Sequence, residues 1–191
     1  MSAVPAPKNP ASIRSLRPVA DALWLEQRRQ DILAETAAAL LAGKEPLAEV
    51  LPQLYASLAS EFSVDASIGF VITDSRDGMA LSFARGFPAD AVEQCIRLDF
   101  GQAVCGTVGA SGRAIHVSGV QGRLDPMTDL IRSVGIAAYA CEPLIANGKV
   151  IGTLSFGSRT RSTFSSDDLR FFAALARLVA GARARYLAVG A

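Results

Sequence analysis

The sequence carries almost no net charge, and it lacks long apolar runs. Lys and Arg number 19 against 18 for Asp and Glu, so the net charge of +1 creates no basic field to attract nucleic acid. No apolar run approaches the roughly 20 residues of a membrane-spanning helix, and the first residues contain no apolar block typical of a signal peptide. These absences predict a cytoplasmic protein that binds neither nucleic acid nor membrane.

Motifs that build phosphate or metal sites are also missing. No G-x-G-x-x-G follows an expected strand and no Walker-type loop occurs, which disfavours folds that cradle phosphates. There is no C-x-x-C pair, and the single histidine, His116, lies between two apolar residues as in an ordinary strand. A site formed by His116 with Cys105 and Cys141 stays open only as an alternative. We expect no metal, and the sequence requires no cofactor.

The composition suits one domain with an N-terminal extension. Half of the 191 residues are hydrophobic and 19% are charged, which is enough material for a buried core. Residues 1–16 contain three prolines and little periodicity, and they predict a disordered tail. Pro18 favours a helix start and Gly43 a helix end, so we predict a helix over residues 17–43. Two rows on it have the seven-residue spacing of a seam for a partner helix: Leu25, Ile32 and Ala39, and Leu33 and Leu40.

The middle of the chain alternates helical and strand patterns. The Asp77-Gly78 and Asn147-Gly148 pairs each lie between apolar runs and indicate β-hairpins. We expect, in order, a helix over 47–62, a hairpin of 66–73 and 79–83, a short helix over 88–95, and a hairpin of 135–144 and 149–156.

The last element is the clearest. Ser165 and Asp168 have the spacing of a capping box, and Arg183 interrupts the apolar pattern that follows. Because this helix is apolar on two faces, it needs two packing partners. Helices at both ends with antiparallel hairpins between them predict an α+β fold with the helices on one face of the sheet. The two apolar stripes are Leu169, Phe172, Ala176, Val179 and Tyr186, and Phe171, Leu175, Leu178 and Ala182.

Three segments follow one another in a family-specific order: FGQAVCGTVGASGRAIHVSGV, then NGKVIGTLSF, then FSSDDLRFFAALARLVA. In this order and spacing the chain resembles a GAF domain, of the type found in bacterial sensor histidine kinases and related signalling proteins. The resemblance implies a six-stranded antiparallel sheet with the N- and C-terminal helices packed on one face. It places the GAF domain over residues 45–187 and makes residues 17–43 a signalling or dimerisation helix.

The same resemblance implies a small-molecule pocket on the other face, roofed by the irregular middle segment. Such sites are mainly apolar with a few placed polar groups, and Asp125 or Asp129 could supply those together with Tyr139. The alternative is that the same side chains form plain core, and no cyclic-nucleotide pattern is present. The expected ligand-binding residues are Phe70, Phe100, Cys105, Asp125, Met127, Ile131, Tyr139, Cys141 and Phe156.

The cysteines leave an enzymatic alternative open. Cys95 and Cys105 are ten residues apart, similar to a pair in free methionine-(R)-sulfoxide reductases, which have a GAF fold and need a nucleophilic thiolate and a resolving thiol. That family has a further cysteine in the following loop, where QGRLDPMTDLIRS has none, and Glu142 is displaced from the expected acid. Bilin attachment is disfavoured because no cysteine precedes a histidine.

The leading hypothesis is therefore a stand-alone sensory or regulatory module and not an enzyme. It would bind a small molecule or sense a signal, and pass the change to a separate partner through its terminal helices, as a homodimer. The alternatives are the thiol reductase, with Cys95 and Cys105 as its catalytic pair, and a protein-interaction module without a ligand.

Overall fold

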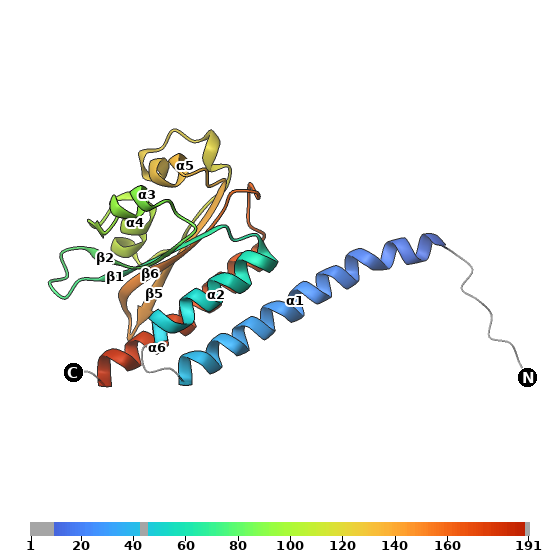
Figure 1. The fold of residues 1–191 in the computed structure, drawn as a ribbon, viewed down its shortest axis with the longest axis horizontal. Coiled ribbons are helices and arrows are strands. Elements are labelled where there is room, and N and C mark those ends of the chain that lie inside the picture. The colour runs from blue at the N-terminus through green and yellow to red at the C-terminus, as the bar shows by residue number, and fades with distance from the viewer. Residues whose placement is uncertain (1–9, 43–45, 190–191) are drawn as a thin grey trace, which may run out of the picture.

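A single antiparallel sheet organises the protein. The computed structural model describes residues 10–42 and 46–189. The sheet has six strands in the order β3-β2-β1-β6-β5-β4 (Figure 1), and its strands alternate between two buried faces because successive side chains point to opposite sides. The strands are β1 (Ala66–Ile72), β2 (Met79–Arg85), β3 (Arg97–Leu98), β4 (Ile115–Val117), β5 (Ala138–Ala146) and β6 (Lys149–Ser158).

Both predicted hairpins are present. The β5–β6 turn uses Asn147 and Gly148 with φ of 50° and 73°, the left-handed pair that matches strand twist in a two-residue turn. The β1–β2 connection is longer, and the Asp77 carboxylate organises it by accepting hydrogen bonds from the hydroxyls of Thr73 and Ser75. The expected Asp77-Gly78 turn is thus part of a larger loop.

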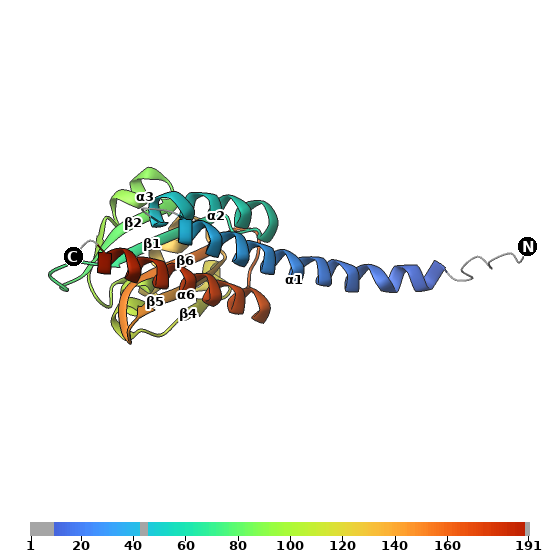
Figure 2. The ribbon, with the colours of Figure 1, turned by 90° about the horizontal axis from the view of Figure 1, so that it is seen from below.

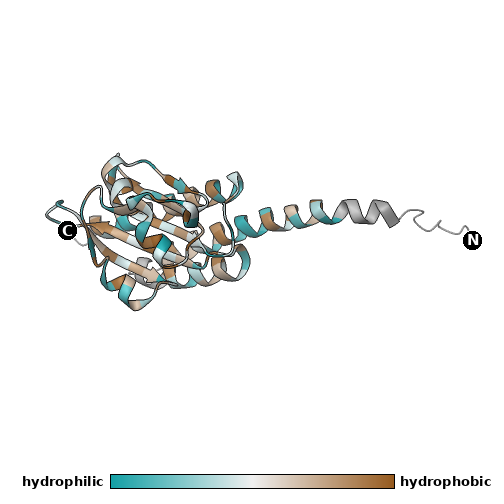
Figure 3. Cartoon of the chain, turned by 90° about the horizontal axis from the view of Figure 1, so that it is seen from above, coloured by the Kyte–Doolittle hydropathy of each residue, from teal (hydrophilic) through white to brown (hydrophobic). Residues whose placement is uncertain are grey.

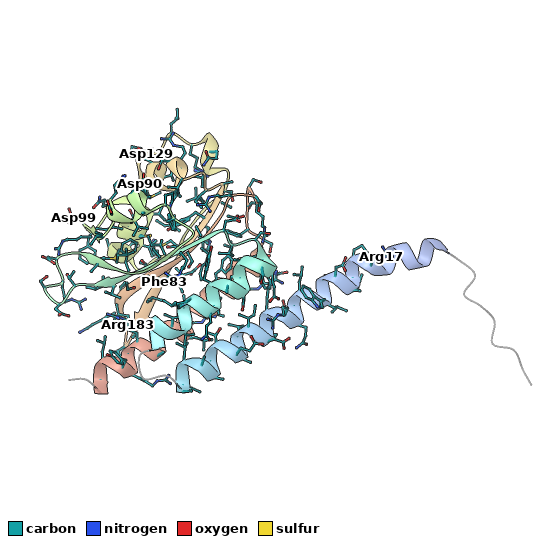
Figure 4. The ribbon with its side chains drawn as sticks, viewed as in Figure 1. Arg17, Phe83, Asp90, Asp99, Asp129 and Arg183 are labelled. Carbon is teal, nitrogen blue, oxygen red and sulfur yellow. The ribbon has the colours of Figure 1, made fainter. Side chains whose placement is uncertain are left out.

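The N- and C-terminal helices lie on one face of the sheet, as predicted: α2 (Pro46–Phe62) and α6 (Ser166–Val189) cover the strands, and α1 (Pro10–Ala42) packs across both of these helices (Figure 2). Aromatic rings fill the space between them and the strands. Phe156 of β6 stacks on Phe172 of α6 with ring centroids 4.3 Å apart, and Phe164 meets Phe172 edge-on at 5.1 Å. Apolar residues follow the strands in Figure 3, and Figure 4 shows Phe83 on this helix-covered side of the sheet.

Helix α1 differs from its prediction in extent and packing. It begins at Pro10, so residues 10–16 of the expected tail are helical and Pro18 lies inside the helix; residues 1–9 and the proposed cap Gly43 lie outside the described residues. The predicted seam does have helical partners, but they belong to the same chain. Ile32 and Leu40 are buried in the core that α2 and α6 share, so they are not free for a second subunit. The N-terminal part of α1 projects away from the domain (Figure 1).

Buried charges join α1 to the start of α6. The capping box is formed, since Asp168 N donates to Ser165 Oγ at 3.2 Å and Ser165 N donates to Asp168 Oδ2 at 2.9 Å. The Asp168 carboxylate also accepts Arg29 of α1 at 2.7 Å and Arg161 at 2.5 Å. Arg29 lies over the Phe62 ring, which covers the ion pair with apolar surface.

Short helices cover the opposite face. We call residues 103–133 the roof: α4 (Ala103–Ser111), the 3₁₀ turns η1 (Val120–Gly122) and η2 (Pro126–Thr128), and α5 (Asp129–Ser133). Helix α3 (Ala89–Glu93) lies beside it (Figure 1). Arg159, at the end of β6, donates to the carbonyls of Val134, Asp65 and Gly86, and so fastens the end of the roof to the edge of the sheet. Within residues 10–42 and 46–189, no helix is both long and apolar enough to span a membrane.

Candidate functional site

A small apolar cavity lies between the roof and the sheet. The cavity volume is about 20 Å³, which is enough for one water molecule. Ligand pockets usually have several hundred Å³. The roof is therefore closed onto the sheet. The lining residues are Ile68, Phe70, Phe87, Leu98, Ala103, Val104, Cys105, Met127, Leu130, Ile131 and Tyr139.

Five of the predicted ligand-binding residues line this cavity: Phe70, Cys105, Met127, Ile131 and Tyr139. Sequence reasoning missed several others. Ile68 is two residues before Phe70 and therefore on the same face of the strand. Leu130 is three residues after Met127, the spacing of one helical turn. The strand and helix periods could therefore have predicted both residues. Phe87 follows strand β2 in a turn, and no pattern marks it.

Four predicted residues do not line the cavity: Phe156, Phe100, Asp125 and Cys141, the last of which is described below with Cys105. Phe156 points to the helix face, because it alternates with Ser155 along β6 and stacks on Phe172. Phe100 lies in a shallow surface hollow with Ile72 and Val150. The exposed Asp125 carboxylate accepts the backbone N–H of Met127 and caps η2. Its role is therefore local: it shapes the roof from outside.

Cys105 is the centre of a polar cluster within this apolar layer. Its Sγ lies 3.3 Å from Tyr139 Oη and 3.4 Å from Ser155 Oγ. Cys141 is the cross-strand partner of Ser155, shares the roof face of β5 with Tyr139, and is also buried. The Cys141 predicted as a pocket residue thus lies behind the cavity wall, next to Cys105.

These neighbours change the acidity of both thiols. The pKa of Cys105 is lowered to about 7, although burial alone would raise it. The largest cause is the Cys141 side chain, and the Ser155 and Tyr139 hydroxyls act in the same direction. Burial and the nearby Cys105 raise the Cys141 pKa well above its ordinary value. Cys105 is therefore the thiol that ionises first, since its thiolate is solvated by fixed donors.

Glycines let α4 approach the sheet closely enough to bring Cys105 there. A Cβ on Gly106 would lie 2.4 Å from the Asp99 carbonyl oxygen, and one on Gly109 would lie 2.3 Å from Met79 Sδ. The turn before α4 uses Gly101 with φ of 85°. The segment FGQAVCGTVGASG is thus crowded at Gly106 and Gly109, where only glycine fits without a shift.

The remaining chemistry-bearing residues lie elsewhere. Cys95 is buried and contacts the carbonyl oxygens of Ala91 and Val92, the ordinary contacts of a thiol at the end of α3. His116 Nε2 lies 2.7 Å from Glu142 Oε1, so it pairs with a carboxylate and not with Cys105 or Cys141. Among the described residues, no three His, Cys, Asp or Glu side chains are grouped to hold a metal ion.

The fold and the roofed cavity define a class of protein. The GAF domain family model matches residues 44–183, and the chain belongs to this family. No curated protein shows a significant match to the sequence.

Solved structures show the same fold at low sequence identity. The GAF domain of a phosphoenolpyruvate-protein phosphotransferase from Coxiella burnetii is 22% identical with a TM-score of 0.72, over 86% of this chain and 97% of that one. A free methionine-R-sulfoxide reductase from Neisseria meningitidis, in complex with its substrate, is also 22% identical with a TM-score of 0.67, over 81% and 87%. The GAF domain of an Acinetobacter phosphoenolpyruvate-protein phosphotransferase is 17% identical with a TM-score of 0.68, over 85% and 96%. GAF domains of phosphotransferases and a reductase are thus similar to this chain in fold.

Proposed function

We propose that the chain is a GAF-type sensory module, in the cytoplasm, whose roof opens to admit a small, mainly apolar molecule. One observation supports this most directly: the closed cavity is lined by apolar side chains with two polar atoms, Tyr139 Oη and Cys105 Sγ, at one wall. This is the composition of small-molecule sites. The present volume fits only water, so binding requires the roof to move outward.

Strands β5 and β6 offer a route from the cavity to the helices. On β6, Ser155 faces Cys105 while the next residue, Phe156, stacks on Phe172 of α6. On β5, Tyr139 faces the cavity while Ala140 packs in the helix-side core. A ligand that binds one strand arrangement better than another would bias the packing of α6 and α1, and only such differential binding produces a signal.

We further propose that α1 carries the signal to a second copy of the chain. Its projecting part exposes Val19, Leu23 and Trp24, two of them one helical turn apart. Charges of both signs, Arg17 and Asp21, accompany them on exposed positions, so two copies can pair without like-charge repulsion. Arg17 is labelled on this projecting part in Figure 4.

A thermal-shift measurement with a panel of small aromatic probes, including indole and benzoate, tests the cavity. Met127→Trp fills the space beneath the roof, whereas Leu124→Trp places the same ring three residues away on a fully exposed part of the roof. We expect at least one probe to raise the melting temperature of the wild type and of Leu124→Trp but not of Met127→Trp. An equal shift in both variants would contradict binding in this cavity, and no shift with any probe favours a protein-interaction module without a ligand.

A thiol reductase is the second candidate, favoured by the lowered pKa of a cysteine that lines the cavity. Its pair would be Cys95 and Cys105, which share one buried cluster, although the Cys95 thiol is hydrogen-bonded to the backbone carbonyls of Ala91 and Val92. Thioredoxin-coupled NADPH consumption with free methionine-(R)-sulfoxide is the test. Turnover that disappears in Cys105→Ser would support this function, and no turnover by the wild type would exclude it.

A further inference from the structure

Two thiols and three hydroxyls are buried together on the roof face of β5, β6 and α4. Cys105, Cys141, Tyr139, Ser155 and Thr153 are each at most 6% exposed. Thr153 Oγ1 has no hydrogen-bond partner among the described residues, although an orphaned buried hydroxyl is costly. If this cluster only filled the core, apolar side chains would stabilise it more than thiols and hydroxyls. The opposite face of the sheet has such an apolar core.

The geometry brings Cys105 and Cys141 together at one hydroxyl. Cys105 Sγ is 3.4 Å from Ser155 Oγ, and Ser155 is the direct cross-strand partner of Cys141. Directly paired residues have Cβ atoms about 4.5–5.5 Å apart, so both sulfurs lie near the Ser155 hydroxyl. Cys95 belongs to the same buried cluster, but its thiol is directed to the carbonyls of Ala91 and Val92.

We propose that Cys105 and Cys141 form a disulfide when hydrogen peroxide enters the cavity. The Cys105 thiolate attacks one peroxide oxygen, the O–O bond breaks, and Cys105 becomes a sulfenic acid as hydroxide leaves. The Cys141 sulfur then attacks the Cys105 sulfur, the S–O bond breaks, and the sulfenic oxygen leaves as water with the Cys141 proton. Peroxide is reduced by two electrons, and the two thiols supply them. A small dithiol restores both thiols and is itself oxidised to a disulfide.

The size of the cavity selects the oxidant. The cavity has room for about one water molecule. It admits peroxide, which is only slightly larger than water, but excludes a tripeptide disulfide such as oxidised glutathione. Because Cys105 lies on α4 and Cys141 on β5, the new bond would fasten the roof to the sheet. It would hold the cavity closed, independently of whether a small molecule binds there.

Peptide mapping of the full chain after brief peroxide treatment tests the proposal, with free thiols blocked under denaturing conditions. We expect a linked Cys105–Cys141 peptide that is about 2 Da lighter than the sum of its two reduced peptides and that dithiothreitol separates. Cys95→Ser is the matched control and keeps the link. Cys141→Ser loses it and instead gains about 16 Da, a sulfenic acid on Cys105.

Other outcomes would overturn the proposal. They are a Cys95–Cys105 link in the wild type, oxidation that stops at sulfinic acid with both cysteines unlinked, or no oxidation at peroxide levels that oxidise a free thiol. An equally fast reaction with oxidised glutathione would overturn the access argument. Wild-type mapping decides the pairing even if Cys141→Ser does not fold. Amide exchange should slow in α4 after oxidation, and an unchanged α4 would contradict the bond between roof and sheet.

Discussion

Two adjacent residues of β6 show how differently the two faces of the sheet are built. Phe156 points to the helix face and stacks on Phe172, with Phe164 edge-on against the same ring. Ser155 points to the roof face, where its hydroxyl meets the Cys105 thiol beside a space for one water. The helix face thus has stacked rings under long helices, and the roof face combines Phe70 and Tyr139 with thiols, hydroxyls and a small cavity under short helices.

The difference indicates which face can change its packing. Close-packed rings have few alternative arrangements of similar energy, whereas short helices beside a cavity open at lower free energy. We therefore expect the helix face to set the stability of the domain and the roof to open more readily. Four substitutions test this division, beginning with the largest expected effect.

Phe172→Ala should cost the most. Its ring is fully buried and contacts Phe156 and Phe164, and truncating such a ring removes burial and leaves a cavity, about 3–5 kcal/mol. Urea unfolding measures the loss. Tyr186→Ala, on the same helix but half-exposed, should cost only about 0.5 kcal/mol. Equal costs for the two variants would contradict a stability-setting helix face.

Asp168→Asn should lower the free energy of unfolding by about 3 kcal/mol, because it removes the buried charge partner of Arg29, which keeps only the exposed Glu26 at 3.4 Å. Burial opposes ionisation of Asp168, but hydrogen bonds from Ser165, Arg29 and Arg161 outweigh it and lower the pKa of the carboxyl. The stabilisation is therefore complete above the unfolded pKa of about 3.9 and is lost as the pH falls through the lower folded value.

Unfolding measured at neutral pH and again in acid checks this dependence. The wild type and Asp168→Asn should differ at pH 7 and converge only in stronger acid, as the pH falls through the lowered pKa of the folded Asp168 carboxyl. A constant difference across that range would mean that the amide acts through its shape, for example by weakening the capping box, and not through the lost charge.

Gly106→Ala should loosen the roof more than the domain. The added Cβ would meet the Asp99 carbonyl oxygen at 2.4 Å, so α4 must shift, at a cost of about 1–3 kcal/mol. Amide hydrogen exchange should accelerate in α4 and α5 while α6 keeps its protection. Gly122→Ala, in open space on the same roof, is the control, and equal acceleration in α6 would show that the two faces are not separable.

Trp24→Glu should have the smallest effect on stability, within about 0.5 kcal/mol, because the ring is 57% exposed on the projecting part of α1. Its effect should be on assembly. We expect sedimentation to show a dimer for the wild type and a monomer for Trp24→Glu, with Gln27→Glu, an exposed change on the same helix, as the charge control. An unchanged oligomeric state in Trp24→Glu would exclude this surface as the interface.

Sequence patterns predicted most of the helix face. The seven-residue rows on α1 and the two stripes on α6 are geometric consequences of helical period, and the Ser165–Asp168 box formed as expected. The pattern could not identify the packing partner, because an apolar stripe can be covered by the same chain or by another one. The row that contains Ile32 packs within its own chain. Arg29 was not anticipated, since its partner lies 139 residues away in sequence.

The roof was predictable in part. Phe70, Met127, Ile131 and Tyr139 reach the cavity because they belong to elements whose faces follow from period. The prediction that Phe156 lines the pocket was wrong by one position, because neighbouring strand residues point to opposite faces of the sheet. Asp125 was wrong because an acidic residue before a Pro caps a turn as readily as it lines a pocket. The contact of Cys105 with Ser155 joins residues 50 apart in sequence and depends on how α4 docks, which no local pattern encodes.

The Arg29–Asp168 contact gives α1 a mechanical property. From Pro10 to Leu25 the helix runs for about 22 Å at 1.5 Å per residue, beyond the point where Arg29 is fastened to α6. Because α1 is held against α2 and α6 from about Leu25 onward, a tilt of about 5° of the held part would move the far end by about 2 Å, given this length. A displacement at α6 too small to alter the core would therefore arrive magnified at the tip of α1.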